Sequence, residues 1–171
     1  MSYFNPMRFI IIIFILILFN GYVFLIEKHK ISSNSMFPNI EDGSVVLSFS
    51  NYYKFFKIKS GDIIFFKRKN DENDICKRVV GLPGDMVQMI DGILHVNKKK
   101  IKTLKLGKVR KDIYSTIYEK DDVEYELNLV KEFLSNNKSY NIVDGGESEL
   151  DNTQVFLVPK NHYFVLGDNR D

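Results

Sequence analysis

The chain begins with one long apolar run and then changes to short apolar runs separated by turns. The first run, FIIIIFILILFNGYVFLI, covers residues 9–26 without a charged residue. As a helix it would span about 27 Å, close to the hydrocarbon thickness of a bilayer. A cleaved signal peptide would have a shorter apolar part followed by small residues, whereas EKHK follows here. The pattern therefore predicts an uncleaved transmembrane anchor over residues 9–26, behind a short N-terminus of residues 1–8.

Beyond this run, apolar and turn residues follow each other at the short spacing that is typical of a mainly β domain. Asp91-Gly92 between two apolar runs predicts a β-hairpin. Residues 123–134 fit either a strand or one face of a helix, and the polar stretch 136–152 is predicted to be a surface loop. Further strands are predicted at residues 44–49, 62–67, 75–82, 112–119, 154–158 and 162–168.

Composition and charge exclude several classes of function. The 171 residues include 24 basic and 22 acidic side chains, for a net charge of +2, which does not favour nucleic-acid binding. Cys76 is the single cysteine, so neither an internal disulfide nor a multi-cysteine zinc site can form. The His, Asp and Glu residues do not have the spacing of metal ligands, and we expect no metal and no cofactor.

Two arrangements for serine catalysis find little support in the sequence. A Ser-His-Asp triad would need one of the three histidines, His29, His95 and His162, beside a serine, and no motif places one there. The segment SNNK at 135–138 matches the S-x-x-K pattern of penicillin-binding enzymes. That motif requires a helix in a cleft, whereas this copy falls in a predicted polar loop, so we interpret it as a chance match.

A serine activated by a lysine remains as the candidate. A serine hydroxyl needs a base to take its proton, and lysine can act as that base only when it is neutral. Burial among apolar side chains lowers the pKa of lysine and so favours the neutral form. Lys77 fits this requirement because Ile75 and Val79 lie on the same face of the predicted strand, whereas Arg78 faces the other way. The simpler alternative is that Lys77 and Arg78 are exposed charges on an edge strand.

Three motifs occur in order behind the apolar run: SNSMFP at 33–38, KRVVGLPGD at 77–85 and GDNR at 167–170. Together they resemble the motifs of bacterial type I signal peptidases (leader peptidases, peptidase family S26). These are membrane-anchored serine endopeptidases that remove signal peptides from exported proteins. The resemblance covers nearly the whole chain, with one mild departure, because Asn34 stands where the family has a small residue.

The resemblance implies a role for each matching residue. Ser35 would be the nucleophile and Lys77 the general base of a Ser-Lys dyad. The Ser33 hydroxyl and the Ser35 backbone N–H would stabilise the oxyanion. Arg78 and Asp168 would form a structural ion pair, for which the alternative is two unrelated surface charges.

The resemblance also implies a substrate and a location. Exported preproteins would bind in extended form beside residues 31–33 and 74–76, with Ile31 and Cys76 lining shallow pockets for small side chains. The protein would be a single-pass, monomeric protein of the bacterial plasma (inner) membrane, with a cytoplasmic N-terminus and the bilayer as a partner. Its extracytoplasmic (periplasmic) catalytic domain, residues 27–171, would have the signal-peptidase β fold, which is related to that of repressor-type proteases. Within this domain, about 92–152 would form a smaller inserted region.

One departure from the family and two rival functions complete these expectations. In the family the last motif continues with a serine that contacts the catalytic lysine, an Asp-Ser-Arg and more strand. The resemblance therefore implies that the C-terminal end is missing, with weak folding and little activity if the chain ends at Asp171. The rivals are a self-cleaving repressor-type protease, against which the apolar run counts, and an inactive truncated homologue that is only a membrane-tethered β domain.

Overall fold

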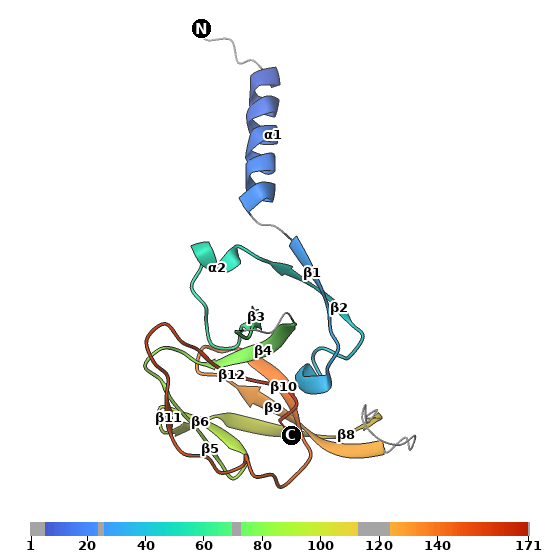
Figure 1. The fold of residues 1–171 in the computed structure, drawn as a ribbon, viewed down its shortest axis with the longest axis vertical. Helices are drawn as coiled ribbons and strands as arrows, with labels where there is room; N and C mark the ends of the chain where they lie inside the picture. Colours follow the sequence, from blue (N-terminus) through green and yellow to red (C-terminus); the bar gives the residue numbers. More distant parts are fainter. Residues whose placement is uncertain (1–5, 24–25, 70–72, 113–123, 171) are drawn as a thin grey trace. The chain divides into compact units, whose positions relative to one another are not determined.

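The computed structural model describes residues 6–23, 26–69, 73–112 and 124–170. The chain divides into two compact units. The first comprises Met1–Lys30 and Val45–Ile58, and the second comprises Ile31–Ser44 and Lys59–Asp171. Strands dominate the order of elements along the chain (Figure 1), which confirms the predicted mainly β class.

The first unit holds the N-terminal helix and a two-stranded sheet. Helix α1 (Pro6–Val23) begins at a proline, which suits this position because the first N–H of a helix has no intrahelical partner. Strand β1 (Ile26–Lys30) pairs antiparallel with β2 (Val45–Phe49). Ile26, which the anchor prediction included, therefore lies in a strand. No helix within the described residues is both long enough and apolar enough to cross a membrane.

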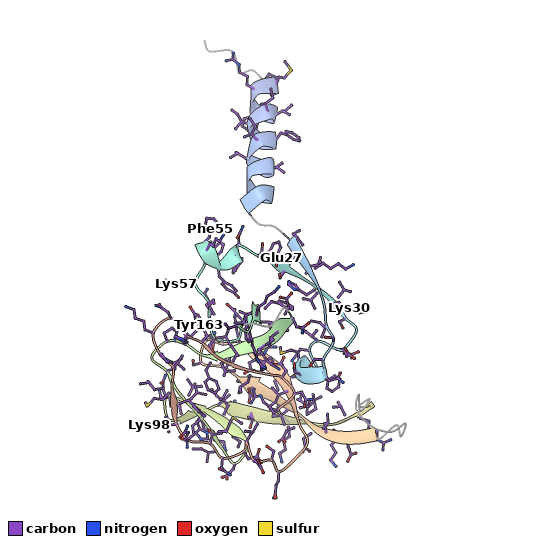
Figure 2. The ribbon with its side chains drawn as sticks, in the orientation of Figure 1. Glu27, Lys30, Phe55, Lys57, Lys98 and Tyr163 are labelled. Atoms are coloured by element: carbon purple, nitrogen blue, oxygen red, sulfur yellow. The ribbon has the colours of Figure 1, made fainter. Side chains whose placement is uncertain are left out.

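The same unit contains the short helix α2 (Tyr52–Phe55), whose aromatic side chains are largely exposed (Figure 2). Phe55 is 61% exposed. The rings of Tyr52 and Phe56 stack with their centroids 4.6 Å apart. The aromatic rings at α2 therefore contact one another and are not buried in a core.

The second unit is built from three antiparallel sheets that contribute to one core. Their strand orders are β12-β4-β3, β11-β5-β6-β7 and β10-β9-β8. Val80 from the first sheet, Val87 from the second and Tyr140 from the third meet in the main cluster of buried side chains. The elements of this unit are η1 (Asn34–Met36), β3 (Ile63–Lys67), β4 (Asp74–Gly81), β5 (Met86–Ile90), β6 (Ile93–Val96), β7 (Lys99–Lys100), β8 (Lys102–Asp112), β9 (Glu124–Phe133), β10 (Ser139–Asp144), β11 (Phe156–Leu157) and β12 (Phe164–Leu166).

The predicted hairpin is confirmed as the β5–β6 pair. Its turn residues Asp91 and Gly92 have φ angles of 48° and 69°. Positive φ at both central residues is the requirement of the turn type that matches the twist of paired strands, and Asp-Gly meets it with little strain. The local sequence therefore determines this hairpin.

The third sheet differs most from expectation. The ambiguous segment 123–134 is strand β9, and the Lys-rich strand β8 beside it was not predicted. The prediction of a surface loop over 136–152 is wrong for Ser139–Asp144, because this segment is β10 and pairs along its length with β9. Of the predicted strand 112–119, only Asp112 lies within the described residues, and it ends β8.

Candidate active site

A short turn at the start of the second unit carries Ser35. The 3₁₀ helix η1 (Asn34–Met36) begins after Ser33, whose Oγ accepts a hydrogen bond of 3.1 Å from the Ser35 N–H. The Phe37 N–H closes the turn by donating to the Asn34 carbonyl at 3.0 Å. Met36 and Phe37 are buried, and Phe37 packs with Leu127 and Val143 of the third sheet. Ser35 is therefore half-buried on a turn that is anchored from below by two apolar side chains.

The same turn bears on the predicted oxyanion donors. In the predicted role, the Ser35 N–H and the Ser33 hydroxyl would both donate to the same oxyanion. In this structure the Ser35 N–H instead donates to the Ser33 hydroxyl oxygen. Ser33 is exposed, so its hydroxyl is free to rotate about χ1. An oxyanion placed here would have to replace the Ser33 oxygen as the acceptor for the Ser35 N–H.

Lys77 lies on β4, the central strand of its sheet. It is half-buried and stands opposite Ile64 of β3. Burial lowers the pKa of Lys77 below its ordinary value of 10.5, and the positive charge of Arg68 acts in the same direction. The negative charge of Asp168 opposes this shift, and so does that of Cys76 once its thiol is deprotonated at high pH. The net result is an amine that loses its proton more readily than an exposed lysine does.

Gly167 lies between the Ser35 backbone and the Lys77 side chain. A Cβ atom placed on Gly167 would overlap the Ser35 carbonyl oxygen and would lie 3.4 Å from Lys77 Nζ. The same carbonyl accepts a hydrogen bond of 3.1 Å from the Asn169 N–H. The turn that carries Ser35 and the amine of Lys77 therefore both lie next to Gly167. The neighbouring backbone atoms leave no room for a side chain at this position, so only glycine fits.

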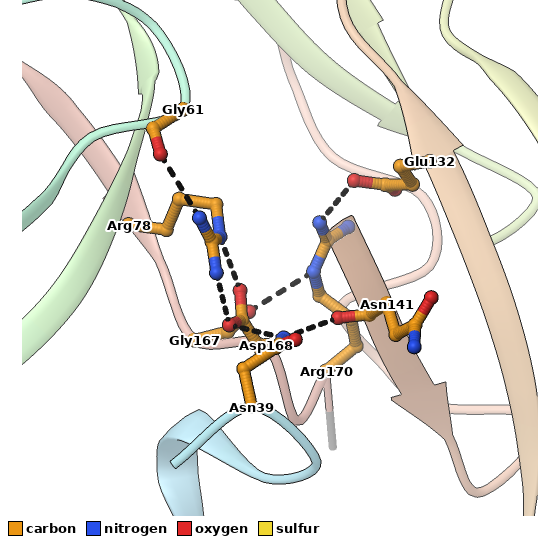
Figure 3. Close-up of polar contacts among 8 residues, drawn as sticks. All are labelled: Asn39, Gly61, Arg78, Glu132, Asn141, Gly167, Asp168 and Arg170. Carbon is orange, nitrogen blue, oxygen red and sulfur yellow. Dashed lines mark hydrogen bonds and ion pairs between the residues drawn. The ribbon is translucent and has the colours of Figure 1, made fainter. Parts of the chain in front are cut away.

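Arg78 and Asp168 form a bidentate ion pair in the interior (Figure 3). Arg78 Nε donates to Asp168 Oδ1 at 2.7 Å, and Nη2 donates to Oδ2 at 2.6 Å. The guanidinium also donates to the Gly61 carbonyl at 2.9 Å and lies 4.0 Å from the centre of the Tyr140 ring. Asp168 is 0% exposed and Arg78 is 7% exposed, so both charges are buried rather than exposed at the surface. This parallel geometry is the strongest form of an arginine–carboxylate contact.

Three further residues of this site were not identified from the sequence. Asn39 Nδ2 donates to Asp168 Oδ2 and to the Asn141 carbonyl, both at 2.7 Å. Arg170 Nη2 donates to the buried carboxylate of Glu132 at 2.6 Å, and Arg170 Nε donates to the Gly167 carbonyl at 3.1 Å. Arg170 belongs to the GDNR motif, which was a usable signal, whereas nothing in the sequence pairs it with Glu132.

The buried Glu132–Arg170 pair supports a prediction about stability. Glu132→Gln is expected to lower the free energy of unfolding by about 3 kcal/mol, because it leaves the Arg170 charge buried without a counter-charge. Denaturant unfolding of both proteins measures the difference. Glu126→Gln is the matched control, because Glu126 pairs with Lys108 at the exposed surface and its loss should not be measurable. Equal stabilities of the two variants would contradict this account of Glu132.

Ile31 and Cys76, the predicted pocket residues, are both buried. Burial raises the pKa of the Cys76 thiol to about 11, with the Asp168 charge acting in the same direction. Strand β3 covers one edge of β4 from Asp74 to Arg78. On the other edge, β12 pairs with β4 only from Arg78 to Gly81. Among the described residues, no named strand pairs with Ile75, Cys76 and Lys77 along the edge of β4 opposite β3.

The histidines use their ring nitrogens in other places. In the first unit, His29 Nε2 and Ser48 Oγ share a hydrogen bond of 2.8 Å. In the second unit, the Nδ1 atoms of His95 and His162 contact the carbonyls of Ile93 and Lys160. Within residues 6–23, 26–69, 73–112 and 124–170, no cluster of three or more His, Cys, Asp or Glu side chains could hold a metal ion.

Comparison with known proteins agrees with the motifs. Residues 4–171 match the family described as signal peptidase, peptidase S26. The chain is similar to signal peptidase I of Rickettsia akari, with 34% identity over 142 residues, which cover 73% of this chain and 49% of the relative. Signal peptidase I of Rickettsia typhi gives the same values, and that of Rickettsia bellii is 34% identical over 140 residues, covering 73% and 45%. The chain spans about half the length of the curated relatives it matches.

Proposed function

The chain belongs to the signal peptidase family, peptidase S26, and on that premise we propose that it is a serine endopeptidase. Its substrates are exported preproteins, which it cleaves after small residues to remove the N-terminal signal peptide. The dyad of Ser35 and Lys77 carries out the reaction. No cofactor takes part, because serine and lysine supply both the nucleophile and the proton carrier.

The proposed reaction runs through an acyl-enzyme. The neutral amine of Lys77 takes the proton of the Ser35 hydroxyl as Oγ attacks the scissile carbonyl carbon. The resulting oxyanion accepts hydrogen bonds from the Ser35 N–H and the Ser33 hydroxyl. When the C–N bond breaks, the Lys77 ammonium gives its proton to the leaving amine, and the signal peptide remains as an ester on Ser35. Lys77 then takes a proton from water, the resulting hydroxide attacks the ester, and Ser35 regains its proton from Lys77.

The observation that carries this proposal is the environment of Lys77 Nζ. Burial lowers the pKa of Lys77, and the amine borders Gly167 together with the Ser35 carbonyl. A general base must be largely neutral at the working pH and within reach of the proton it removes. The lowered pKa of Lys77 favours the first requirement, and its place next to the serine-bearing turn favours the second.

The substrate groove is proposed at the edge of β4 opposite β3. An extended peptide that adds to this edge would pair with the backbone from Ile75 to Lys77, where β12 does not pair with β4. Ile31 and Cys76 would line the side-chain pockets, and both are already buried. Shallow pockets of this kind accept small side chains and exclude large ones for lack of space, which fits the small residues at signal-peptide cleavage sites.

Membrane attachment is proposed from the apolar N-terminal run. Within this run, residues 9–23, which lie in α1, would anchor the protein in the plasma (inner) membrane, with residues 1–8 in the cytoplasm. Residues 27–171 would lie outside the cytoplasm, with about 92–152 as a smaller inserted region. The apolar segment of a signal peptide occupies the same bilayer, so a tethered enzyme and its substrate meet in two dimensions.

A serine-reactive acylating probe tests the proposal against a binding-only β domain. Incubation with the full chain in detergent, followed by digestion and mass spectrometry, is expected to place the label on Ser35. The same preparation should cleave a preprotein after a small residue, as read by N-terminal sequencing of the product. A label on Ser135, the serine of the SNNK segment, or the absence of both labelling and cleavage would overturn the assignment.

A further inference from the structure

One carboxylate, that of Asp168, joins the two elements that carry the proposed nucleophile and base. Oδ1 accepts from Arg78 Nε, and Oδ2 accepts from both Arg78 Nη2 and Asn39 Nδ2. Figure 3 shows Asn39 reaching this carboxylate from the turn beyond η1, on the side away from Arg78. Asp168 is 0% exposed, whereas Asn39 lies at the surface and reaches the carboxylate from there.

Asn39 is linked to Ser35 through the backbone of Met36. The N–H groups of Asn39 and Ile40 both donate to the Met36 carbonyl, at 3.0 and 2.9 Å. Met36 is the buried neighbour of Ser35 and fixes the turn from below. These backbone bonds connect the residue that bonds to Asp168 with the turn that carries Ser35.

Lys77 is linked to the same carboxylate from the other side. It precedes Arg78 on β4, and both residues are held by the pairing of β4 with β3. Asp168 bonds to the side chain of Arg78, the residue that follows Lys77 on this strand. The distance between nucleophile and base then depends on how firmly each element is bonded to Asp168.

We propose that Asn39 is a positioning residue for the dyad: its side-chain amide holds the turn that carries Ser35 against Asp168, at a fixed distance from Lys77. This inference rests on the proposed function of Ser35 and Lys77. The amide suits the place because its NH₂ group has two hydrogens, one for Asp168 and one for the Asn141 carbonyl. A hydroxyl would serve one of these acceptors, alanine neither, and a carboxylate would be repelled by Asp168.

Substitution at Asn39 tests this inference through the order of effects. The expected kcat for preprotein cleavage falls in the order Asn, Ser, Ala, Asp, with KM nearly unchanged. Asn39→Ala should lose about 10–100-fold in kcat, because a displacement of about 1 Å at a reacting group costs up to about 100-fold. Asn39→Asp should lose more than Asn39→Ala, although Asp has nearly the volume of Asn. If Asn39 acted only by packing, Asn39→Asp would instead lose less kcat than Asn39→Ala.

Asn136→Ala is the matched control. Asn136 Nδ2 also donates to a backbone carbonyl, that of Ser60, at 2.7 Å, and this bond involves neither Asp168 nor the turn that carries Ser35. Its replacement should leave kcat within about twofold of the original, since it keeps the dyad in place. Equal effects of Asn136→Ala and Asn39→Ala on kcat would overturn the inference and leave the proposed function intact.

A second readout does not depend on cleavage. The pKa of Lys77, followed by NMR of chain labelled with ¹³C at the lysine ε-carbon, should rise toward its ordinary value in Asn39→Ala. The reason is that a loosened turn admits water to the amine. Asn136→Ala should leave it unchanged. If the original protein does not cleave preproteins, the proposed function fails, and this titration alone decides the inference: an unmoved pKa in Asn39→Ala overturns it.

Discussion

Replacement of Lys77 by arginine is expected to abolish cleavage as fully as Ser35→Ala does, lowering kcat by at least about 10⁴-fold. Arginine keeps the positive charge and most of the length of lysine, but it is not deprotonated in a protein. If Lys77 acted only through its charge, arginine would replace it. Because the proposed role is proton removal, a permanently protonated side chain cannot perform it.

The pH dependence of cleavage gives the same test in the original protein. Only the neutral form of Lys77 is active, so the rate should rise with pH through the pKa of Lys77. Burial lowers this pKa below 10.5, so the midpoint should lie below that of an exposed lysine. Initial rates across a pH series measure the midpoint.

Lys102→Arg is the control for both experiments, because Lys102 is an exposed residue of β8. It should leave the rate and its pH midpoint unchanged. Retention of more than about one hundredth of the rate in Lys77→Arg would contradict a general-base role, since a positioned base contributes about 10²–10⁴-fold.

Asp168→Ala is expected to lower the free energy of unfolding by about 3–5 kcal/mol, the usual effect of removing one partner of a buried ion pair. The substitution leaves the Arg78 guanidinium buried without its counter-charge and removes the acceptor of Asn39. Since domains are stable by only about 5–15 kcal/mol, much of the population could unfold. Chemical denaturation monitored by circular dichroism measures the change.

Two further variants identify the cause of this loss. Asp74→Ala removes an exposed carboxylate that lies 4.0 Å from Lys67, and it should have a much smaller effect. The double variant Arg78→Met/Asp168→Leu removes both charges and should be more stable than Asp168→Ala alone. If the double variant is instead less stable than the single one, an unpaired buried charge is not the cause.

Local chemistry explains why part of this fold could be predicted from the sequence. The β5–β6 hairpin needs two residues at positive φ, and the dipeptide Asp91-Gly92 predicts such a turn without reference to the rest of the chain. Strand β4 was predicted equally well, because its apolar residues are buried on both faces in the centre of a sheet.

Strand β10 shows where this approach fails. Asn, Ser, Gly and Asp around it are typical of loops, yet Tyr140, Ile142 and Val143 are buried. The strand is stabilised by distant partners: β9 pairs with it, and the Val143 N–H and carbonyl bond to Asp168 and Arg170. A window of neighbouring residues contains none of these partners, so composition favoured the wrong state.

The residues of the candidate site likewise divide into those that could be identified from the sequence and those that could not. Ser35 and Lys77 lie in motifs whose residues are close in sequence, and their resemblance to a known family assigned them roles. Asn39 and Asp168 are 129 residues apart, and Glu132 and Arg170 are 38 apart. Side-chain contacts over such separations depend on the register of several strands, which no single segment of the chain determines.

Cys76 gives this site a property that concerns inhibitors. The thiol is buried next to Lys77, and its pKa of about 11 keeps it almost wholly protonated at neutral pH. Electrophilic drugs that rely on cysteine react with the thiolate, so the one sulfhydryl of this protein is a poor warhead target. A covalent inhibitor of this site would therefore have to react with a hydroxyl oxygen rather than with this thiol.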